Sequence, residues 1–203
     1  ESHGKTTINT LDNASEGTIN ANGADLTITA ALGAGLETFQ LQTNRNTNLT
    51  LTGGGAENFP ASITELGNFA TGDANELNAD LHIYGNYGGA LDGSVIAGGV
   101  LTVGANTLQV DGIYNADADD WAGSTIILNG PIEAWGTAGA DNASLTIGGS
   151  GEIEDPTALA DLLNLTMNRP AATLNMIACE IAANGSLTIN QGTVNATGAI
   201  SNA

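Results

Sequence analysis

Short triplets of an apolar residue, a threonine and a second apolar residue recur along the chain. The clearest copies are Leu26-Thr27-Ile28, Leu49-Thr50-Leu51, Leu101-Thr102-Val103, Leu145-Thr146-Ile147, Leu165-Thr166-Met167 and Leu187-Thr188-Ile189. Weaker copies stand at Thr7-Ile8, Leu81-His82-Ile83 and Thr125-Ile126-Ile127. Apolar side chains at alternate positions are typical of a β-strand with one buried face. The pattern therefore predicts short strands throughout.

The spacing of the triplets predicts how these strands are arranged. Their sites fall near positions 7, 26, 49, 81, 101, 125, 145, 165 and 187, mostly 19 to 24 residues apart. A period of this length indicates a solenoid, whose stacked coils bury each other's apolar rows. Turn-forming pairs such as Asn22-Gly23, Asp111-Gly112 and Asn129-Gly130 lie between the strands. We expect an all-β fold, a right-handed parallel β-helix of about nine coils of roughly 20–24 residues, with 1–203 as one domain.

Two segments depart from the repeat, and one other fold remains open. Residues 53–80 stretch one interval to about 32 residues, which predicts an insertion. In residues 155–163, Asp155 as a helix N-cap and Pro156 at the first helical position predict one or two helical turns. A sandwich of β-hairpins is the alternative fold, although it predicts turns every 8–12 residues or so without a longer repeat.

Composition narrows the range of partners. The chain has 3 Lys and Arg against 22 Asp and Glu, which gives a formal net charge of -19. Nucleic acid is excluded, because phosphate binding needs clustered basic residues and Lys5, Arg45 and Arg169 stand far apart. No apolar run reaches the length of about 18 residues that spans a membrane, so no membrane insertion is expected. Cys179, the only cysteine, lies in an apolar run and is expected to be a small buried side chain.

Two strings in the last third of the chain resemble a known class of repeats. They are Leu163-Asn164-Leu165-Thr166-Met167-Asn168-Arg169-Pro170 and Ala183-Asn184-Gly185-Ser186-Leu187-Thr188-Ile189-Asn190-Gln191-Gly192-Thr193-Val194. Both resemble repeats of secreted bacterial β-solenoid surface proteins, such as autotransporter-type passengers and adhesins with pectin-lyase-like, right-handed β-helices. The resemblance implies an extracellular or cell-surface protein that acts in adhesion, biofilm or surface architecture. The absence of an initiator Met before Glu1 is consistent with a removed signal peptide.

One acidic stretch suggests a cation site. Asn115, Asp117, Asp119 and Asp120 place oxygen-bearing side chains mostly at alternate positions, as calcium loops do. The stretch is no EF-hand, because Ile126 stands where the bidentate Glu is required and Asp120 replaces the turn Gly. Calcium is the only cofactor that the sequence suggests, and an exposed acidic turn is the alternative.

Neighbouring aromatic residues suggest a glycan site, whereas catalysis is not expected. Trp121 and Trp135 could form a sugar-stacking platform near the acidic turn, although two tryptophans are more often packed at the edge of an insertion. A polysaccharide lyase of this fold needs a basic residue beside acids, and neither Arg45 nor Arg169 has acidic neighbours in sequence. His82 takes the outward threonine position of its triplet, which predicts a solvent-facing imidazole.

These features favour an extracellular structural subunit that stacks through its solenoid ends into a fibre or surface layer. The chain stops partway through a repeat without a clear polar cap at either terminus, and uncapped strand edges invite association. The charge of -19 opposes such stacking, so we expect divalent cations or end contacts that avoid the acids. The alternative is a fragment of a longer adhesin that binds glycans or cell surfaces. A polysaccharide-degrading enzyme is the least favoured function.

Overall fold

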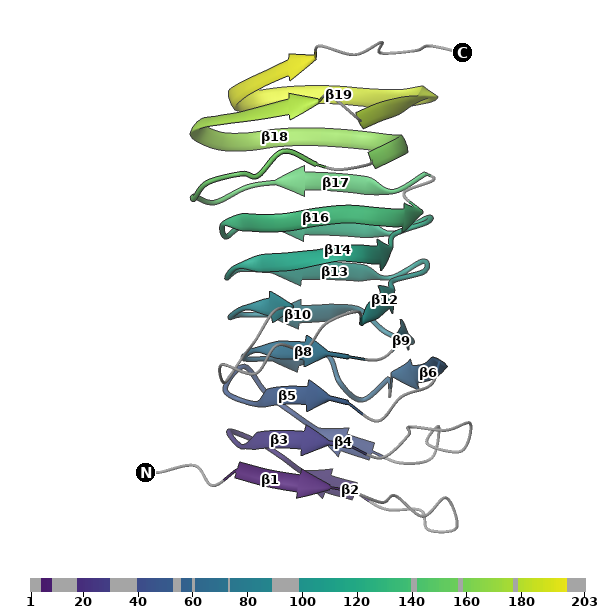
Figure 1. Ribbon diagram of the computed structural model, residues 1–203, viewed down its shortest axis with the longest axis vertical. Coiled ribbons are helices and arrows are strands. Elements are labelled where there is room, and N and C mark those ends of the chain that lie inside the picture. Colours follow the sequence, from purple (N-terminus) through teal and green to yellow (C-terminus); the bar gives the residue numbers. More distant parts are fainter. Residues whose placement is uncertain are drawn as a thin grey trace.

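The chain folds into a parallel β-solenoid whose coils stack along one long axis (Figure 1). The computed structural model describes residues 5–8, 18–29, 40–52, 56–59, 61–72, 74–88, 99–139, 142–156, 159–176 and 179–196. In these residues the named strands pair in parallel and no helix is present. The predicted all-β, right-handed parallel β-helix is confirmed.

Most strands stack into three faces. The first face holds β1 (Lys5–Ile8), β3 (Asp25–Ile28), β5 (Asn48–Leu51), β8 (Phe69–Thr71), β11 (Tyr87–Gly88), β14 (Tyr114–Asp120) and β16 (Ile132–Gly139). The second holds β6 (Ala56–Phe59), β9 (Ala74–Leu77) and β12 (Val100–Thr102). The third holds β7 (Glu65–Leu66), β10 (Leu81–Ile83), β13 (Thr107–Val110), β15 (Thr125–Leu128), β17 (Ser144–Ile147), β18 (Leu159–Met176) and β19 (Cys179–Ala196). Two further strands, β2 (Thr18–Asn20) and β4 (Gln40–Gln42), pair with each other.

The strand β14 joins the first two faces. Its first residue, Tyr114, pairs with Tyr87 of β11, whereas its last residue, Asp120, pairs with Thr102 of β12. Register shifts in its pairing with β16 lie between these two ends. One bent strand therefore turns a corner of the solenoid, and the two faces form one ten-stranded sheet.

About six turns are present rather than the nine expected. The third face has seven strands, from β7 to β19, and thus six intervals between neighbours. The estimate of nine assumed that all triplets form one column. The structure places the triplet at Leu26 on the first face, that at Leu101 on the second and that at Leu145 on the third. Because the triplets are distributed over different faces, their number does not count the turns.

Two apolar columns on the inner side of the third face form much of the core. One column contains Leu81, Leu108, Ile126, Leu145 and Leu165, and the other contains Ile83, Val110, Leu128, Ile147 and Met167. All of these side chains are at most 1% exposed. Because full burial of one such side chain contributes about 1.5–3 kcal/mol, the stacking of coils supplies a large part of the stability.

The corners of the coils are held by stacked polar and glycine residues. Asn48 Nδ2 donates to Asp25 Oδ1 at 2.7 Å, and Asn68 Nδ2 donates to Asn48 Oδ1 at 2.7 Å. At another corner, Gly112 and Gly130 pass so close to the carbonyl of the preceding coil that a Cβ atom would collide with it. The turns predicted at Asp111-Gly112 and Asn129-Gly130 are thus explained by close backbone approach.

The helix predicted for residues 155–163 is absent from the described part of this segment. Asp155 and Pro156 are irregular, residues 157–158 lie outside the described part, and β18 begins at Leu159. Leu162 pairs with Ile181 of β19 and is fully buried. Ladder pairing between coils and burial of this leucine override the local capping signal, as tertiary context often does.

The segment 53–80, predicted as an insertion, is part of the solenoid in its described residues. These residues are 56–59, 61–72 and 74–80. They form β6, β7, β8 and β9, and each of these strands pairs with a neighbour in one of the three faces. The interval is long because it supplies additional strands. None of the described segments is a helix long and apolar enough to cross a membrane.

Candidate functional site

The residues predicted as a calcium site all belong to β14, and those whose side chains the structure describes do not converge. Asn115 Nδ2 donates to Glu133 Oε2 of β16 at 3.3 Å, while Asp120 Oδ1 accepts a backbone N–H two residues on at 3.0 Å. Asp119 is fully buried, and the side chain of Asp117 lies outside the described part. Over the described ranges, no group of three or more His, Cys, Asp and Glu side chains could hold a metal ion. The described side chains of Asn115, Asp119 and Asp120 therefore do not form a calcium site by themselves.

Asp119 instead fixes the corner made by β14. Its Oδ2 accepts from Tyr114 Oη at 2.7 Å, and its Oδ1 accepts from Tyr87 Oη at 3.0 Å and from the N–H of Leu101 at 2.9 Å. Burial, followed by the charge of Asp119, raises the pKa of both tyrosines well above the ordinary value. Three donors converge on one buried carboxylate, which is the arrangement that burying an acidic group requires.

The two tryptophans are part of the core. Trp121 is 0% and Trp135 is 1% exposed. The ring of Trp121 packs edge-on against Tyr114 at a centroid distance of 5.9 Å, and Trp135 Nε1 donates to the carbonyl oxygen of Glu154 at 2.5 Å. Neither indole presents a face to solvent, so this pair does not form the sugar-stacking platform that was one interpretation of the sequence.

Arg169 is also fully buried, and its guanidinium is occupied by backbone. Nε donates to Gly148 O at 2.7 Å and Nη2 to Gly130 O at 2.7 Å. Longer bonds join Nη2 to Leu128 O at 3.2 Å, and Nη1 to Gly151 O at 3.3 Å and Glu152 O at 3.5 Å. Burial lowers the pKa of this guanidinium. The position inside the core gives Arg169 a structural role and removes it from any surface chemistry, whereas Arg45 is exposed.

A shallow groove of about 540 Å³ lies on the outer side of the third face. We call it the His82 groove. It crosses β7, β10 and β13 and is lined by Thr64, Glu65, Asp80, Leu81, His82, Thr107 and Gln109. Three neighbouring coils therefore contribute polar side chains to one surface, because the outward positions of paired strands lie side by side.

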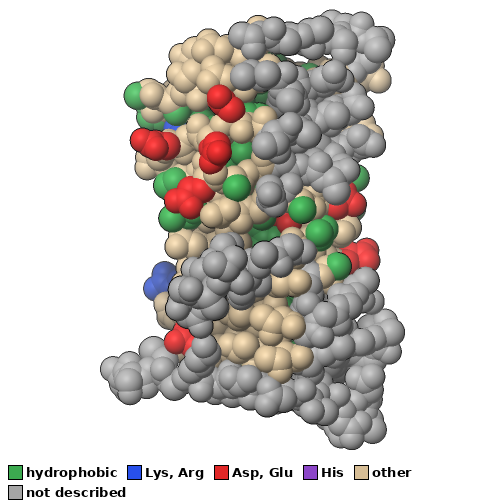
Figure 2. Space-filling model, in the orientation of Figure 1, with side chains coloured by type: hydrophobic (Ala, Val, Ile, Leu, Met, Phe, Trp, Pro, Cys, Tyr) green, Lys and Arg blue, Asp and Glu red, His purple; other side chains and the backbone are tan. Residues whose placement is uncertain are grey.

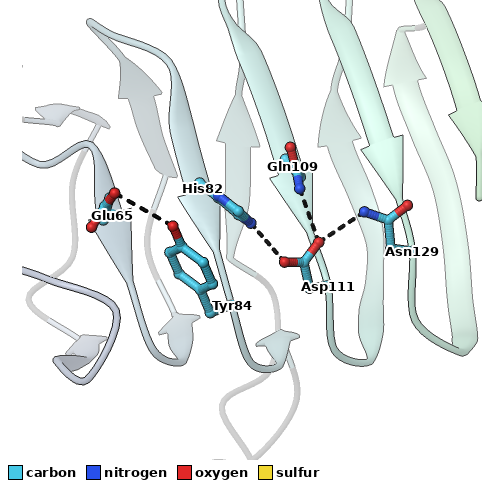
Figure 3. A network of polar contacts seen from close by, with 6 residues as sticks. All are labelled: Glu65, His82, Tyr84, Gln109, Asp111 and Asn129. Atoms are coloured by element: carbon cyan, nitrogen blue, oxygen red, sulfur yellow. Dashed lines mark hydrogen bonds and ion pairs between the residues drawn. The ribbon is translucent and has the colours of Figure 1, made fainter. Parts of the chain in front are cut away.

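His82 belongs to a polar network on this surface that is centred on Asp111 (Figure 3). Its Nε2 lies 2.7 Å from Asp111 Oδ2, and the two side chains are 27% and 31% exposed. An ionised carboxylate only accepts hydrogen bonds, so the imidazole donates here. Asp111 Oδ1 also accepts from Gln109 Nε2 at 3.0 Å and from Asn129 Nδ2 at 2.8 Å. Partial burial would raise the pKa of Asp111, but the bonds from Asn129, Gln109 and His82 lower it overall.

Tyr84 extends the network toward β7. Its ring stacks on the imidazole of His82, with centroids 3.8 Å apart and planes at 25°. Its hydroxyl is 3.4 Å from Glu65 Oε1, at the long limit of a hydrogen bond. Figure 3 shows Tyr84 between Glu65 and His82. An aromatic pair thus stands beside the carboxylate of the groove.

A second surface is the open side of β19, which we call the terminal face. Leu187 and Ile189 continue the two buried columns, because they pair with Leu165 and Met167. They are nevertheless 38% and 49% exposed. A ladder of amides reaches the same strand, since Asn195 Nδ2 donates to Asn175 Oδ1 at 2.9 Å. The terminal face therefore has the apolar rows of a coil that lacks a neighbour among the described residues.

Comparison with known proteins adds no family assignment. No protein-family model, no curated protein and no solved structure matches the chain.

The sequence predicts contact surfaces at the solenoid ends, but it does not identify the His82 groove as a site. The outward position of His82 was predicted, but Asp111 is 29 residues away and Asn129 lies another coil further on. Aligning the strands in register would have placed His82 beside Gln109, and this was the available signal. This alignment requires knowing which strands form the third face. The strand that contains Gln109 was not among the predicted triplets, because it lacks the apolar-Thr-apolar pattern.

Proposed function

We propose that this protein is an extracellular structural subunit that stacks end to end, with the terminal face covered by a second copy of the chain. One observation carries the proposal. Leu187 and Ile189 are 38% and 49% exposed, whereas the residues before them in the same columns are at most 1% exposed. The extracellular location rests on the resemblance to secreted β-solenoid proteins.

A second copy suits this surface because stacking would extend what each coil already does. The terminal face offers an open strand edge and two apolar rows. At the other end of the solenoid, β1 pairs only with β3 among the described strands, so its second edge is open as well. Joining these ends continues the parallel ladder in a head-to-tail contact, and such contacts produce filaments when the rotation does not close a ring.

The charge distribution supports the same contact. The whole chain has a net charge of -19, yet residues 181–203 contain no Asp, Glu, Lys or Arg. Between Arg169 and the end of the sequence the only charged residue is Glu180. The end that carries the exposed leucine and isoleucine is thus also the end that contributes least to repulsion between copies. The sequence predicts assembly either through divalent cations or through end contacts that avoid the acidic residues. The terminal face offers a contact of the second kind.

A pair of matched substitutions tests the proposal. Ile189→Asp places a charge in the apolar row, whereas Thr188→Asp places the same charge on the neighbouring, outward position of β19. We expect the unmodified protein to form linear assemblies in electron microscopy and to show a concentration-dependent mass in sedimentation velocity. Ile189→Asp should reduce assembly at least about tenfold, because burying an unpaired carboxylate costs several kcal/mol. Thr188→Asp should retain most of it.

Two results would contradict the proposal. The first is an unmodified protein that remains monomeric at all concentrations, with and without calcium. The second is an equal loss of assembly in both variants, which would show that added charge acts without regard to the terminal face. Thermal unfolding of each variant separates loss of assembly from loss of folding.

A further inference from the structure

We propose that the His82 groove binds a saccharide that carries free amino groups. The inference is independent of end-to-end stacking, because the groove lies on the side of the solenoid and involves none of the residues of the terminal face. It also differs from the glycan site suggested by the sequence, since Trp121 and Trp135 are buried elsewhere in the core.

The lining of the groove selects against anions and favours cations. Glu65 and Asp80 supply carboxylates, and no Lys or Arg lines the groove. The chain has only three basic residues. Arg169 is not available to pair with an acidic ligand, because it is buried and its guanidinium donates to backbone carbonyl groups. A ligand with ammonium groups therefore complements this surface, whereas a uronic acid or a phosphate would be repelled.

The aromatic pair beside the groove favours the same ligand. Tyr84 is 38% exposed, and its ring is held by stacking on His82. An exposed aromatic face attracts the apolar face of a sugar ring and also an ammonium group, through the cation–π interaction. The hydroxyls of Thr64 and Thr107 and the amide of Gln109 both donate and accept, so they can pair with sugar hydroxyls. Amino and hydroxyl groups together describe an amino sugar.

The polar groups of the groove are already held in place. Asp111 binds His82 and Gln109 together, and Asp80 Oδ1 accepts the N–H of Thr107 at 2.7 Å. Neighbouring strands lie about 4.8 Å apart, so equivalent side chains repeat regularly across the groove. Side chains that need little ordering lose less entropy when a ligand binds. A linear oligosaccharide that crosses the three strands can therefore contact several of them at once.

Isothermal titration with a glucosamine oligomer tests the proposal. An N-acetylglucosamine oligomer of the same length and a lysine oligomer serve as comparison ligands, near physiological ionic strength. We expect the glucosamine oligomer to bind at least about tenfold more tightly than its acetylated counterpart. Glu65→Gln should weaken this binding about tenfold through the loss of a charge-assisted hydrogen bond, and Tyr84→Ala should weaken it several-fold.

The matched control is Glu152→Gln, which removes the same charge from an exposed position in a different groove, lined by Glu133, Glu152 and Glu154. It should leave the affinity unchanged. The proposal is overturned if the glucosamine oligomer does not bind at millimolar concentration. It is also overturned if the lysine oligomer binds equally well and all three variants behave alike, since attraction to net charge would then be sufficient. The Ile189→Asp variant, which should not assemble, should bind the glucosamine oligomer as the unmodified protein does. Its titration therefore tests the groove independently of end-to-end stacking.

Discussion

Arg169 has a buried charge whose partners are all backbone carbonyls. Leu128 and Gly130 belong to the coil of β15, whereas Gly148 follows β17 in the next coil. The planar guanidinium has five N–H donors, so it can donate to carbonyls of both coils at once. This geometry is specific to arginine. A side chain that lies between successive coils in this way supplies donors to buried carbonyls such as those of Gly130 and Gly148. The carbonyl of Leu128 also accepts the N–H of Gly148, so Arg169 adds a second donor there.

Replacing Arg169 should therefore destabilise the fold strongly. We expect Arg169→Met to lower the free energy of unfolding by at least about 3 kcal/mol, because the buried carbonyls of Gly130 and Gly148 lose their arginine donor. Arg169→Lys should recover little, since an ammonium group cannot match the fork of the guanidinium. Urea denaturation measures both changes. Arg45→Met, at an exposed position, is the control and should change stability by no more than about 0.5 kcal/mol. A cost of Arg169→Met as small as that of the control would show that the carbonyls find other partners.

At the scale of strands, the third face is held on its outer side as well as in the core. Asp111 follows β13 and binds His82 of β10 on one side and Asn129, after β15, on the other. One carboxylate thus connects three consecutive strands. The hydrogen bonds that connect the strands also lower the pKa of Asp111 against the opposing effect of partial burial.

This lowered pKa predicts how stability depends on pH. The carboxyl of Asp111 has a lower pKa in the folded chain than in the unfolded chain, where it is about 3.9. Its stabilising contribution is then complete above the unfolded value and is lost as the pH falls through the folded value. Asp111→Asn should therefore cost more stability at about pH 6 than at about pH 3. Chemical denaturation at both pH values measures this, with Glu152→Gln as the control for net charge. A cost that is the same at both pH values would refute the assignment.

At the scale of the whole molecule, an acidic solenoid presents an apolar end. Figure 2 shows acidic side chains in several separate groups, on both the left and the right of the view. The net charge of -19 must repel neighbouring copies, while the described residues 181–196 of the terminal face contain no Asp, Glu, Lys or Arg. Assembly is then a balance between long-range repulsion and short-range burial of apolar side chains. Only the repulsion is weakened by salt.

This balance predicts that salt promotes assembly. The Debye length falls from about 10 Å at 0.1 M to about 3 Å at 1 M ionic strength, so repulsion between copies should decrease over this range. We expect the mean mass in light scattering to rise with sodium chloride concentration and to be unaffected by a chelator. Assemblies that dissolve in salt or on chelation would instead indicate ends bridged by divalent cations.

The local part of this structure could be read from the sequence. Alternation in Leu145-Thr146-Ile147 predicts a strand with one buried side, because successive side chains of a strand point to opposite faces. Asn129-Gly130 predicts a turn, because glycine tolerates close backbone approach. The period of about 20 residues predicts stacked coils, since a unit this short cannot bury its apolar face alone. These inferences need only neighbouring residues and their repetition.

Tertiary structure alone decided which face each segment joins and what surrounds each side chain. The face depends on how many residues each corner uses, and β14 shows that one strand can belong to two faces. Leu159 begins a strand despite the capping signal before it, because pairing between coils satisfies its backbone. Arg169 and Asp119 are buried because donors and acceptors from other coils converge on them. Such convergence depends on the three-dimensional register of coils, which no local pattern contains.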